Sequence, residues 1–430
     1  MRFDEMNLTP ELLDGLEAMN FKEATPIQEQ TMPIVLNGSD LLACAQTGTG
    51  KTAAYLLPIL NILCQGKLTE DKINVLIMVP TRELAQQIDQ QLEAFAYFVP
   101  VSSVAVYGGG DGRLFDQQNK ALRAGVDVVI ATPGRLIALL NMGHIDLSKV
   151  SFFVLDEADR MLDMGFVDDI MHINSYLPPV GKRQTLLFSA TMAPKIEQLA
   201  QKVLHHPESV KLSTSKPADK IDQSAYICYE AQKLELIKQI LKADSPDKVI
   251  VFSSSKQKVK EIYKTFRSLH LKVAAMHSDL EQKDRDEVIR NFKNGHVQVL
   301  VATDIVARGI DIEDIDMVVN YDVPHDVEDY VHRVGRTARA NKGGTAITFV
   351  AEKDQFSFGA IEKFIEKDIR KPALPEALGD APAYNPGRRF KEARGKNDSH
   401  GNQRHRKFQH SRPKRNTQKQ VKSNNNNQQA

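Results

Sequence analysis

The chain has 430 residues, 42% of them hydrophobic and 26% charged, with a formal net charge of +1. One hydrophobic core usually spans at most about 250–300 residues, so this length predicts two domains with additional segments. No run approaches the roughly 20 apolar residues of a membrane span, and the amino terminus has no charged-then-apolar secretion signal. We therefore expect a cytoplasmic protein with no membrane partner.

The near-neutral total hides an uneven distribution of charge. Residues 385–430 hold 13 Lys and Arg against two acids, a net charge of +11, so the rest of the chain carries −10. A basic tail on an acidic body favours binding to an anionic polymer, most simply a nucleic-acid backbone.

Apolar strand candidates alternate with helical patterns through most of the chain, which predicts parallel sheets covered on both faces. The first set of strands is expected at 41–45, 75–79, 104–107, 126–131, 152–155 and 185–189. The second set is expected at 248–252, 273–277, 297–302, 317–321 and 345–350. We predict domains at 1–206 and 223–372, a polar linker at 207–222, and a basic tail at 373–430 that is too polar to form a core.

The most informative stretch lies between the first apolar strand and an apolar-faced helix that continues to Leu63. Its glycines allow backbone N–H groups to point at phosphate oxygens, and the helix amino terminus favours negative charge. Lys51 is expected to reach the β- and γ-phosphates, and Thr52 to bind Mg²⁺. The alternative is a strand-to-helix turn that holds no ligand. The predicted loop is Ala45, Gln46, Thr47, Gly48, Thr49, Gly50, Lys51 and Thr52.

A second group of acids follows the apolar strand at 152–155. In phosphoryl transfer an aspartate at such a strand end holds Mg²⁺, and a neighbouring carboxylate polarises the attacking water. We assign Asp156 to the metal and Glu157 to the water. The alternative is a solvated helix amino terminus, where acids are favoured in any case.

Taken in order, the short motifs of the chain resemble those of the DEAD-box RNA helicases. The likeness covers roughly residues 3–370. In the first half it rests on Thr25-Pro26-Ile27-Gln28, the loop at 45–52, Pro80-Thr81-Arg82-Glu83-Leu84-Ala85, Thr132-Pro133-Gly134-Arg135, the Asp-Glu-Ala-Asp at 156–159, and Ser189-Ala190-Thr191. In the second half it rests on Ala302-Thr303-Asp304, Ala307-Arg308-Gly309-Ile310-Asp311, and the run from Tyr330 to Arg339.

The resemblance implies two tandem RecA-like domains with ATP and Mg²⁺ bound between them. Gln28 would read the adenine edge, Phe21 would stack on the base with support from Phe3, and Asp311 would hold the ribose. Phe21 could instead be a core aromatic.

Arg336 and Arg339 resemble the arginines that reach the γ-phosphate from the second domain, a role that the charge of that phosphate requires in any case. Each could alternatively form a surface salt bridge. In the family, further residues tie the acids of the first domain to the closed state of the two domains. The residues that resemble them here are Asp159, Ser189, Thr191 and His332.

For RNA, the family pattern points to small, hydroxyl-bearing or arginine positions, which suit phosphates and 2′-hydroxyls and read bases poorly. We therefore expect binding that is independent of RNA sequence. The positions are Pro80, Thr81, Arg82, Gly109, Thr132, Gly134, Arg135, Ser253, Arg285, Thr303 and Gly309.

Some positions depart from the family pattern. Asn20 stands where a glycine is usual, Ala338 and Ala340 replace glycines, and Ser253-Ser254-Ser255 replaces a more usual threonine pattern.

The expected function is an RNA-dependent ATPase that locally unwinds short duplexes. An ATP-gated RNA clamp or annealing chaperone is the alternative, and DNA translocation is disfavoured. The compact core with a basic tail resembles the bacterial RhlE-like branch, which implies ribosomal precursors or the RNA-decay machinery as partners.

Overall fold

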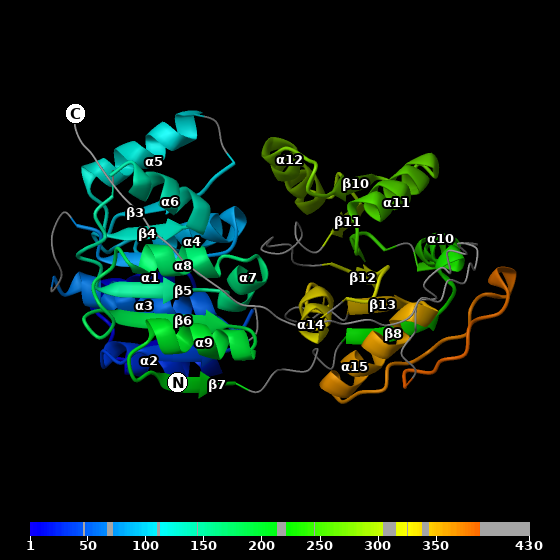
Figure 1. Cartoon of the computed structure of the whole chain (residues 1–430), viewed down its shortest axis with the longest axis horizontal. Coiled ribbons are helices and arrows are strands. Elements are labelled where there is room, and N and C mark those ends of the chain that lie inside the picture. Colours follow the sequence, from blue (N-terminus) through cyan, green and yellow to red (C-terminus); the bar gives the residue numbers. More distant parts are fainter. Residues whose placement is uncertain are drawn as a thin grey trace, which may run out of the picture. The chain divides into compact units, whose positions relative to one another are not determined.

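The computed structural model describes residues 1–45, 48–66, 72–109, 112–143, 145–212, 221–244, 246–303, 315–324, 326–337 and 344–387. Within them the helices and strands form two α/β domains, each built around a parallel sheet (Figure 1). The predicted fold class, two tandem RecA-like domains, is confirmed.

The first domain has a sheet of seven strands in the order β3-β4-β2-β5-β6-β1-β7, every pair parallel. Its strands are β1 Leu41–Cys44, β2 Val75–Met78, β3 Ser103–Val106, β4 Val128–Ala131, β5 Phe152–Leu155, β6 Gln184–Ser189 and β7 Glu208–Lys211. The helical segments are η1 Phe3–Glu5, α1 Pro10–Ala18, α2 Pro26–Leu36, α3 Lys51–Cys64, α4 Arg82–Phe95, α5 Gly112–Ala124, α6 Pro133–Asn141, α7 Ala158–Asp163, α8 Val167–Asn174 and α9 Pro194–Val203.

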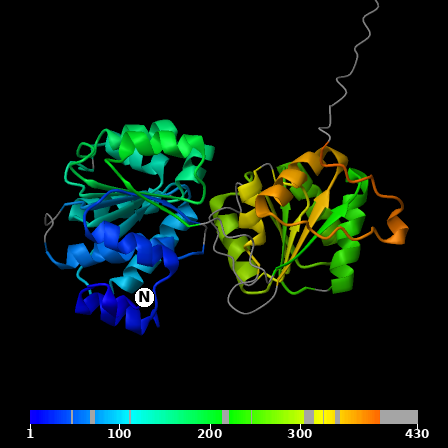
Figure 2. The same cartoon turned by 90° about the horizontal axis from the view of Figure 1, so that it is seen from below.

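Alternating side chains of these strands point to opposite faces of the sheet, and both faces are buried. On β2, Val75 and Ile77 pack with α1 to α4, whereas Leu76 and Met78 pack in the cluster that includes α6 to α9. Figure 2 shows helices on both sides of the sheet. Burial on two faces explains why the strands are continuous apolar runs.

The second domain has a sheet of six parallel strands in the order β10-β11-β9-β12-β13-β8. Its strands are β8 Ile221–Ile227, β9 Val249–Ser253, β10 Val273–Met276, β11 Val299–Thr303, β12 Met317–Asn320 and β13 Gly344–Val350. The helical segments are η2 Glu230–Gln232, α10 Lys233–Asp244, α11 Lys256–Ser268, α12 Gln282–Lys293, α14 Val327–Val334, η3 Glu352–Asp354, α15 Gln355–Ile365 and η4 Glu376–Leu378. Val249 and Val251 of β9 pack with α10 and α11, while Ile250 and Phe252 face α12.

Six strands of the first sheet and all six of the second follow the same spatial order. The strands β3, β4, β2, β5, β6 and β1 correspond to β10, β11, β9, β12, β13 and β8, and β7 is the additional edge strand. Equivalent strand ends can therefore be compared between the two domains.

The predicted linker at 207–222 is partly wrong. Residues 208–211 form β7, which pairs with β1, and Ile221 and Asp222 begin β8. Residues 213–220 lie outside the described residues.

The predicted tail also begins too early. Leu374 and Leu378 pack against the core of the second domain, as does Tyr384. The Gln355 amide donates to the Ala383 carbonyl at 2.9 Å and accepts from the Asn385 backbone N–H at 2.6 Å. Residues 373–387, which we call the strap, thus belong to this domain, and 388–430 lie outside the described residues.

Among the helices that the structure describes, none has the length and apolar character needed to cross a membrane.

Candidate active site

Apart from Phe21 and Gln28, which precede β1 in the chain, the predicted site residues of the first domain follow the carboxyl ends of the strands, where parallel α/β sheets bind ligands. The phosphate loop follows β1, the acids follow β5, and Ser189 ends β6, three strands that are neighbours in the order β5-β6-β1. The candidate RNA residues follow β2, β3 and β4, which are neighbours in the order β3-β4-β2. The strand order therefore separates the candidate nucleotide residues from the candidate RNA residues.

The described part of the phosphate loop has the backbone that its glycines predict. Gly48 and Gly50 have φ of +80° and +94°, in the left-handed region. Lys51 begins α3, is 7% exposed, and donates from Nζ to the Ala45 carbonyl at 2.6 Å. The lysine is thus held across the loop at the helix amino terminus. Gln46 and Thr47 lie outside the described residues.

Gln28 contacts this loop directly. Its Nε2 donates to the Gly50 carbonyl at 3.1 Å, and its Oε1 accepts from the Thr25 backbone N–H at 2.9 Å. A Cβ at Gly50 would lie 2.5 Å from Nε2 and displace the Gln28 amide, and the φ of +94° would strain any other residue there. An amide has capacity for a further hydrogen bond at each end, and adenine recognition by Gln28 stays a prediction.

Phe21 is half-buried in a cluster of aromatic rings. Its centroid lies 5.5 Å from that of Phe95, edge to face, and 6.5 Å from that of Phe3, which is buried. The ring packs against the core and also keeps an accessible part.

Asp156 is 2% exposed, and each of its carboxylate oxygens has a donor. Oδ1 accepts from the Glu157 backbone N–H at 2.8 Å, and Oδ2 accepts from the Tyr55 hydroxyl at 2.9 Å. Burial raises the pKa of Asp156 to about 6, although Lys51 acts in the opposite direction. A nearby cation therefore favours the ionised carboxylate. Sequence reasoning missed Tyr55, which reads as one more apolar residue of α3.

Glu157 is held in an uncommon backbone conformation, with φ of +51°, and is 8% exposed. Arg160 donates from Nη1 to its Oε2 at 2.9 Å and is itself buried. This ion pair orients the carboxylate that we assigned to the attacking water. Arg160 was not predicted, although its position three residues after Glu157 on a helix is the spacing of such pairs.

Asp159 joins the acidic segment to the turn after β6. Its Oδ2 accepts from the backbone N–H groups of Ala190 and Thr191 at 3.0 and 3.1 Å. The Ser189 Oγ accepts from the Thr191 N–H at 3.2 Å, and the Ser189 carbonyl accepts from the Ala45 N–H at 3.0 Å. Hydrogen bonds thus connect the phosphate loop, the turn and Asp159.

Among the candidate RNA residues of the first domain, two arginines lie over aromatic rings. Arg82 lies 4.9 Å from the Tyr107 ring centroid and donates to the Gly109 carbonyl at 3.4 Å. Arg135 lies 5.1 Å from the Phe115 centroid and donates to Gln118 at 3.3 Å. The remaining candidates here shape the strand ends: Pro80 is buried, Thr81 and Thr132 are the N-cap residues of α4 and α6, Gly109 has φ of +86°, and Gly134 faces open space.

In the second domain, Ser253 and Thr303 end β9 and β11, and Arg285 lies on α12 after β10, so these candidates also follow neighbouring strands. The Arg285 Nη2 donates to the Ser278 carbonyl at 3.1 Å. Ser253 is fully buried and donates to Asp322 Oδ2 at 3.0 Å. Its hydroxyl is thus engaged within the protein, and an RNA contact by Ser253 stays a prediction.

Among the predicted residues after β12, His332 lies on α14 and Arg336 follows that helix, both half-buried. Gly309, Asp311 and Arg339 lie outside the described residues.

Comparison with known proteins identifies the family of the chain. Residues 25–199 match the DEAD/DEAH box helicase family model, and residues 232–341 match that of the helicase conserved C-terminal domain. The ATP-dependent RNA helicase CshA of Listeria monocytogenes is 40% identical over 375 residues, 87% of this chain and 71% of the relative. The RNA helicase RhlB of Photorhabdus laumondii is 37% identical, over 94% of this chain and 95% of the relative.

A solved structure of S. cerevisiae Dbp5 bound to RNA and ADP-BeF₃ is similar with a TM-score of 0.76 and 32% identity, covering 86% of this chain and 95% of Dbp5. The two family models together span more than half of the residues. The chain belongs to the DEAD-box family of ATP-dependent RNA helicases.

Proposed function

We propose that this ATP-dependent RNA helicase binds ATP on the β5-β6-β1 half of its first sheet and RNA on the β3-β4-β2 half. The observation that carries the proposal is the order of the strands, which separates the two residue sets along one edge. Lys51 and the loop N–H groups bind the phosphates, Gln28 and Phe21 bind the adenine, and Asp311 binds the ribose.

The chemistry of the site fits Mg²⁺. This ion prefers oxygen ligands and is usually held by one or two protein groups together with substrate phosphates and water. Asp156 and Thr52 supply a carboxylate and a hydroxyl, and no cluster of three or more His, Cys, Asp or Glu with ligand geometry occurs within the described residues. Bound Mg²⁺ would neutralise charge on the phosphates.

Glu157 accepts a proton from the attacking water, and Arg160 keeps its carboxylate oriented. Arg336 and Arg339 of the second domain stabilise the charge that develops on the transferred phosphoryl group. Asp159, Ser189, Thr191 and His332 couple this site to the RNA half.

RNA is held through its backbone on both domains, so duplexes are unwound without regard to sequence. ATP and RNA favour the same closed state, and each therefore raises the affinity for the other. Closure separates a short duplex locally, and hydrolysis resets the enzyme. The predicted domain boundaries are part of this proposal, with β7 added to the first domain and the strap added to the second.

An ATP-gated RNA clamp or annealing chaperone is the second candidate, favoured by the net charge of +11 at 385–430. We further infer that the enzyme works in the cytoplasm, where ATP and RNA are available, on ribosomal precursors or with the RNA-decay machinery. Membership of the RhlE-like branch stays a prediction.

The direct test measures ATP hydrolysis without nucleic acid, with single-stranded RNA, and with DNA of the same sequence. RNA alone should stimulate turnover, and the same preparation should separate a short RNA duplex. A turnover that is indifferent to RNA would overturn the proposal, while stimulation without strand separation would favour the clamp.

A further inference from the structure

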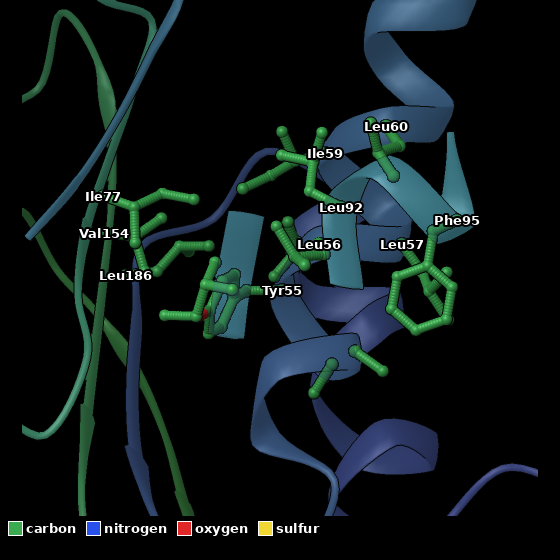
Figure 3. Close-up of a cluster of buried hydrophobic side chains, with 14 of the residues drawn as sticks. Tyr55, Leu56, Leu57, Ile59, Leu60, Ile77, Leu92, Phe95, Val154 and Leu186 are labelled. Carbon is green, nitrogen blue, oxygen red and sulfur yellow. The ribbon is translucent and has the colours of Figure 1, made fainter. Parts of the chain in front are cut away.

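Tyr55 is a tyrosine in a place where packing alone requires only its ring. It lies on the second turn of α3, is fully buried, and packs in the cluster that contains Val154 and Leu186 (Figure 3). Its centroid lies 5.2 Å from that of Phe188. A phenylalanine would fill the same space, so the hydroxyl calls for a separate explanation.

The hydroxyl contacts a buried carboxylate. It donates to Asp156 Oδ2 at 2.9 Å. A phenol has one proton, and here that proton points to Asp156. Tyr55 therefore orients one of the two residues to which we assign Mg²⁺, and it lies on the helix that carries the other, Thr52.

The link joins parts of the chain that are otherwise independent. Tyr55 belongs to α3, whereas Asp156 follows β5, about a hundred residues later. The other carboxylate oxygen of Asp156 is fixed by the Glu157 N–H. With both oxygens engaged, the carboxylate has one orientation before any ligand arrives.

We propose that Tyr55 is a positioning residue that holds the Asp156 carboxylate in the orientation in which it receives Mg²⁺ together with the nucleotide. The inference rests on the proposed magnesium role of Asp156. Groups that orient metal ligands through a hydrogen bond typically contribute 10–100-fold to metal affinity. The expected effect is therefore on the metal and not on nucleotide binding as such.

The test is Tyr55→Phe, which keeps the ring and removes the hydroxyl. Mn²⁺ in place of Mg²⁺ is titrated into the complex of the full chain with ADP, and free Mn²⁺ is followed by electron paramagnetic resonance. We expect Mn²⁺ affinity to fall about tenfold. The Mg²⁺ concentration for half-maximal ATPase activity should rise by a similar factor, and saturating Mg²⁺ should restore most of kcat.

Tyr330→Phe is the matched control. Tyr330 is also fully buried, and its hydroxyl donates to Gln223 Oε1 at 2.9 Å in the second domain. The Tyr330→Phe substitution removes an equivalent hydrogen bond and should leave Mn²⁺ affinity unchanged. Equal melting temperatures of the two variants would show that a difference in metal binding does not come from unfolding.

Asp156→Asn separates the inference from its basis. If Asp156→Asn weakens Mn²⁺ binding and Tyr55→Phe does not, Tyr55 is a packing residue and the inference is wrong. If Asp156→Asn also leaves Mn²⁺ binding unchanged, the proposed metal site itself fails. A loss of kcat in Tyr55→Phe that saturating Mg²⁺ does not restore would equally contradict a positioning role toward the metal.

Discussion

In the second domain, Lys233 Nζ lies 3.1 Å from Asp322 Oδ1. These two residues follow the strands that are equivalent to the ones preceding Lys51 and Asp156 in the first domain. Each lysine is the first residue of the helix after the equivalent strand, β8 or β1, and each aspartate closely follows β12 or β5. Lys51 donates to a loop carbonyl, whereas Lys233 is fully buried against a carboxylate. In the second domain the lysine and the aspartate thus neutralise each other, whereas in the first the equivalent residues are those that we propose bind ATP and Mg²⁺.

A second lysine completes this cluster. Lys258 Nζ lies 2.6 Å from Asp322 Oδ1, and Ser253 and Ser254 donate to Oδ2. Burial opposes ionisation of Asp322, but the two lysines outweigh it, and the pKa of this carboxyl lies well below its usual range. The cluster therefore fixes the end of β9.

Lys233→Met should destabilise the protein strongly, because it leaves the buried Asp322 without one of its cations. Breaking a buried ion pair typically costs about 3–5 kcal/mol. The free energy of unfolding in urea measures the effect. Lys238→Met is the control: its partner Glu235, at 2.9 Å, is exposed, so a loss within about 1 kcal/mol is expected. Similar losses of unfolding free energy in both variants would show that the buried cluster stabilises the protein no more than an exposed ion pair does.

Glu157→Gln should bind ATP and RNA and hydrolyse ATP at least about 100-fold more slowly, since general bases contribute at least that factor. Single-turnover hydrolysis, together with binding of a fluorescent nucleotide, separates the two effects. Lys51→Ala should instead lose nucleotide affinity. Normal hydrolysis by Glu157→Gln would remove Glu157 from its assigned role.

Truncation after Gly387 should weaken RNA affinity and flatten its salt dependence while RNA-stimulated ATPase remains. The removed residues carry all 13 Lys and Arg counted above, and each phosphate contact that is lost reduces the slope of log affinity against log salt by about 0.7 for single strands. Fluorescence anisotropy of labelled RNA, measured from low to high salt, gives the RNA affinity and this slope. An unchanged slope would mean that this segment does not bind RNA. A cut after Tyr384 is a poorer experiment, because Asn385 is bonded to Gln355.

His277 should make the second domain less stable in mild acid. Burial and neighbouring Lys260 lower its pKa, with Asp279 acting in the opposite direction and Lys256 and Arg285 adding to the lowering. Its Nδ1 accepts from the Asp279 N–H at 3.3 Å, a bond that the protonated ring cannot make. Because the folded-state pKa lies below that of the unfolded chain, stability is complete above about pH 6.5 and falls as pH decreases.

The measurement compares unfolding of wild type and His277→Gln in urea at pH 7.5 and pH 5.5. The variant should lose less stability between the two conditions. Exposed His296→Gln serves as the control and should follow wild type. A parallel loss in all three proteins would show that His277 is not responsible.

The sequence predicted the central strands because they are buried on both faces and read as apolar runs. It failed for β7, whose only buried residue is Val210, and for β8, where Gln223 and Ser224 are buried polar residues. The strap was missed because its proline-rich composition is typical of disorder, yet Leu374, Leu378 and Tyr384 pack on the domain.

Candidate site residues within one motif could be proposed from their spacing, whereas contacts between distant segments could not be predicted. Nothing in the pattern of α3 distinguishes Tyr55 from its apolar neighbours, since its partner Asp156 is adjacent only through the pairing of the strands. The hydrogen bond from Ser253 to Asp322 could not be predicted for the same reason, because the two residues are far apart in the sequence.

The strap has a consequence for how the enzyme holds a long transcript. Because Tyr384 donates to Glu362 of α15, the polypeptide that follows starts from a fixed point on the second domain. If the basic segment that follows binds RNA, as we predict, the helicase has two RNA-binding sites, and engagement of one raises the effective concentration of the other. Release of an RNA from the sheet edges would then be followed by rebinding nearby, and the enzyme could act repeatedly on one molecule.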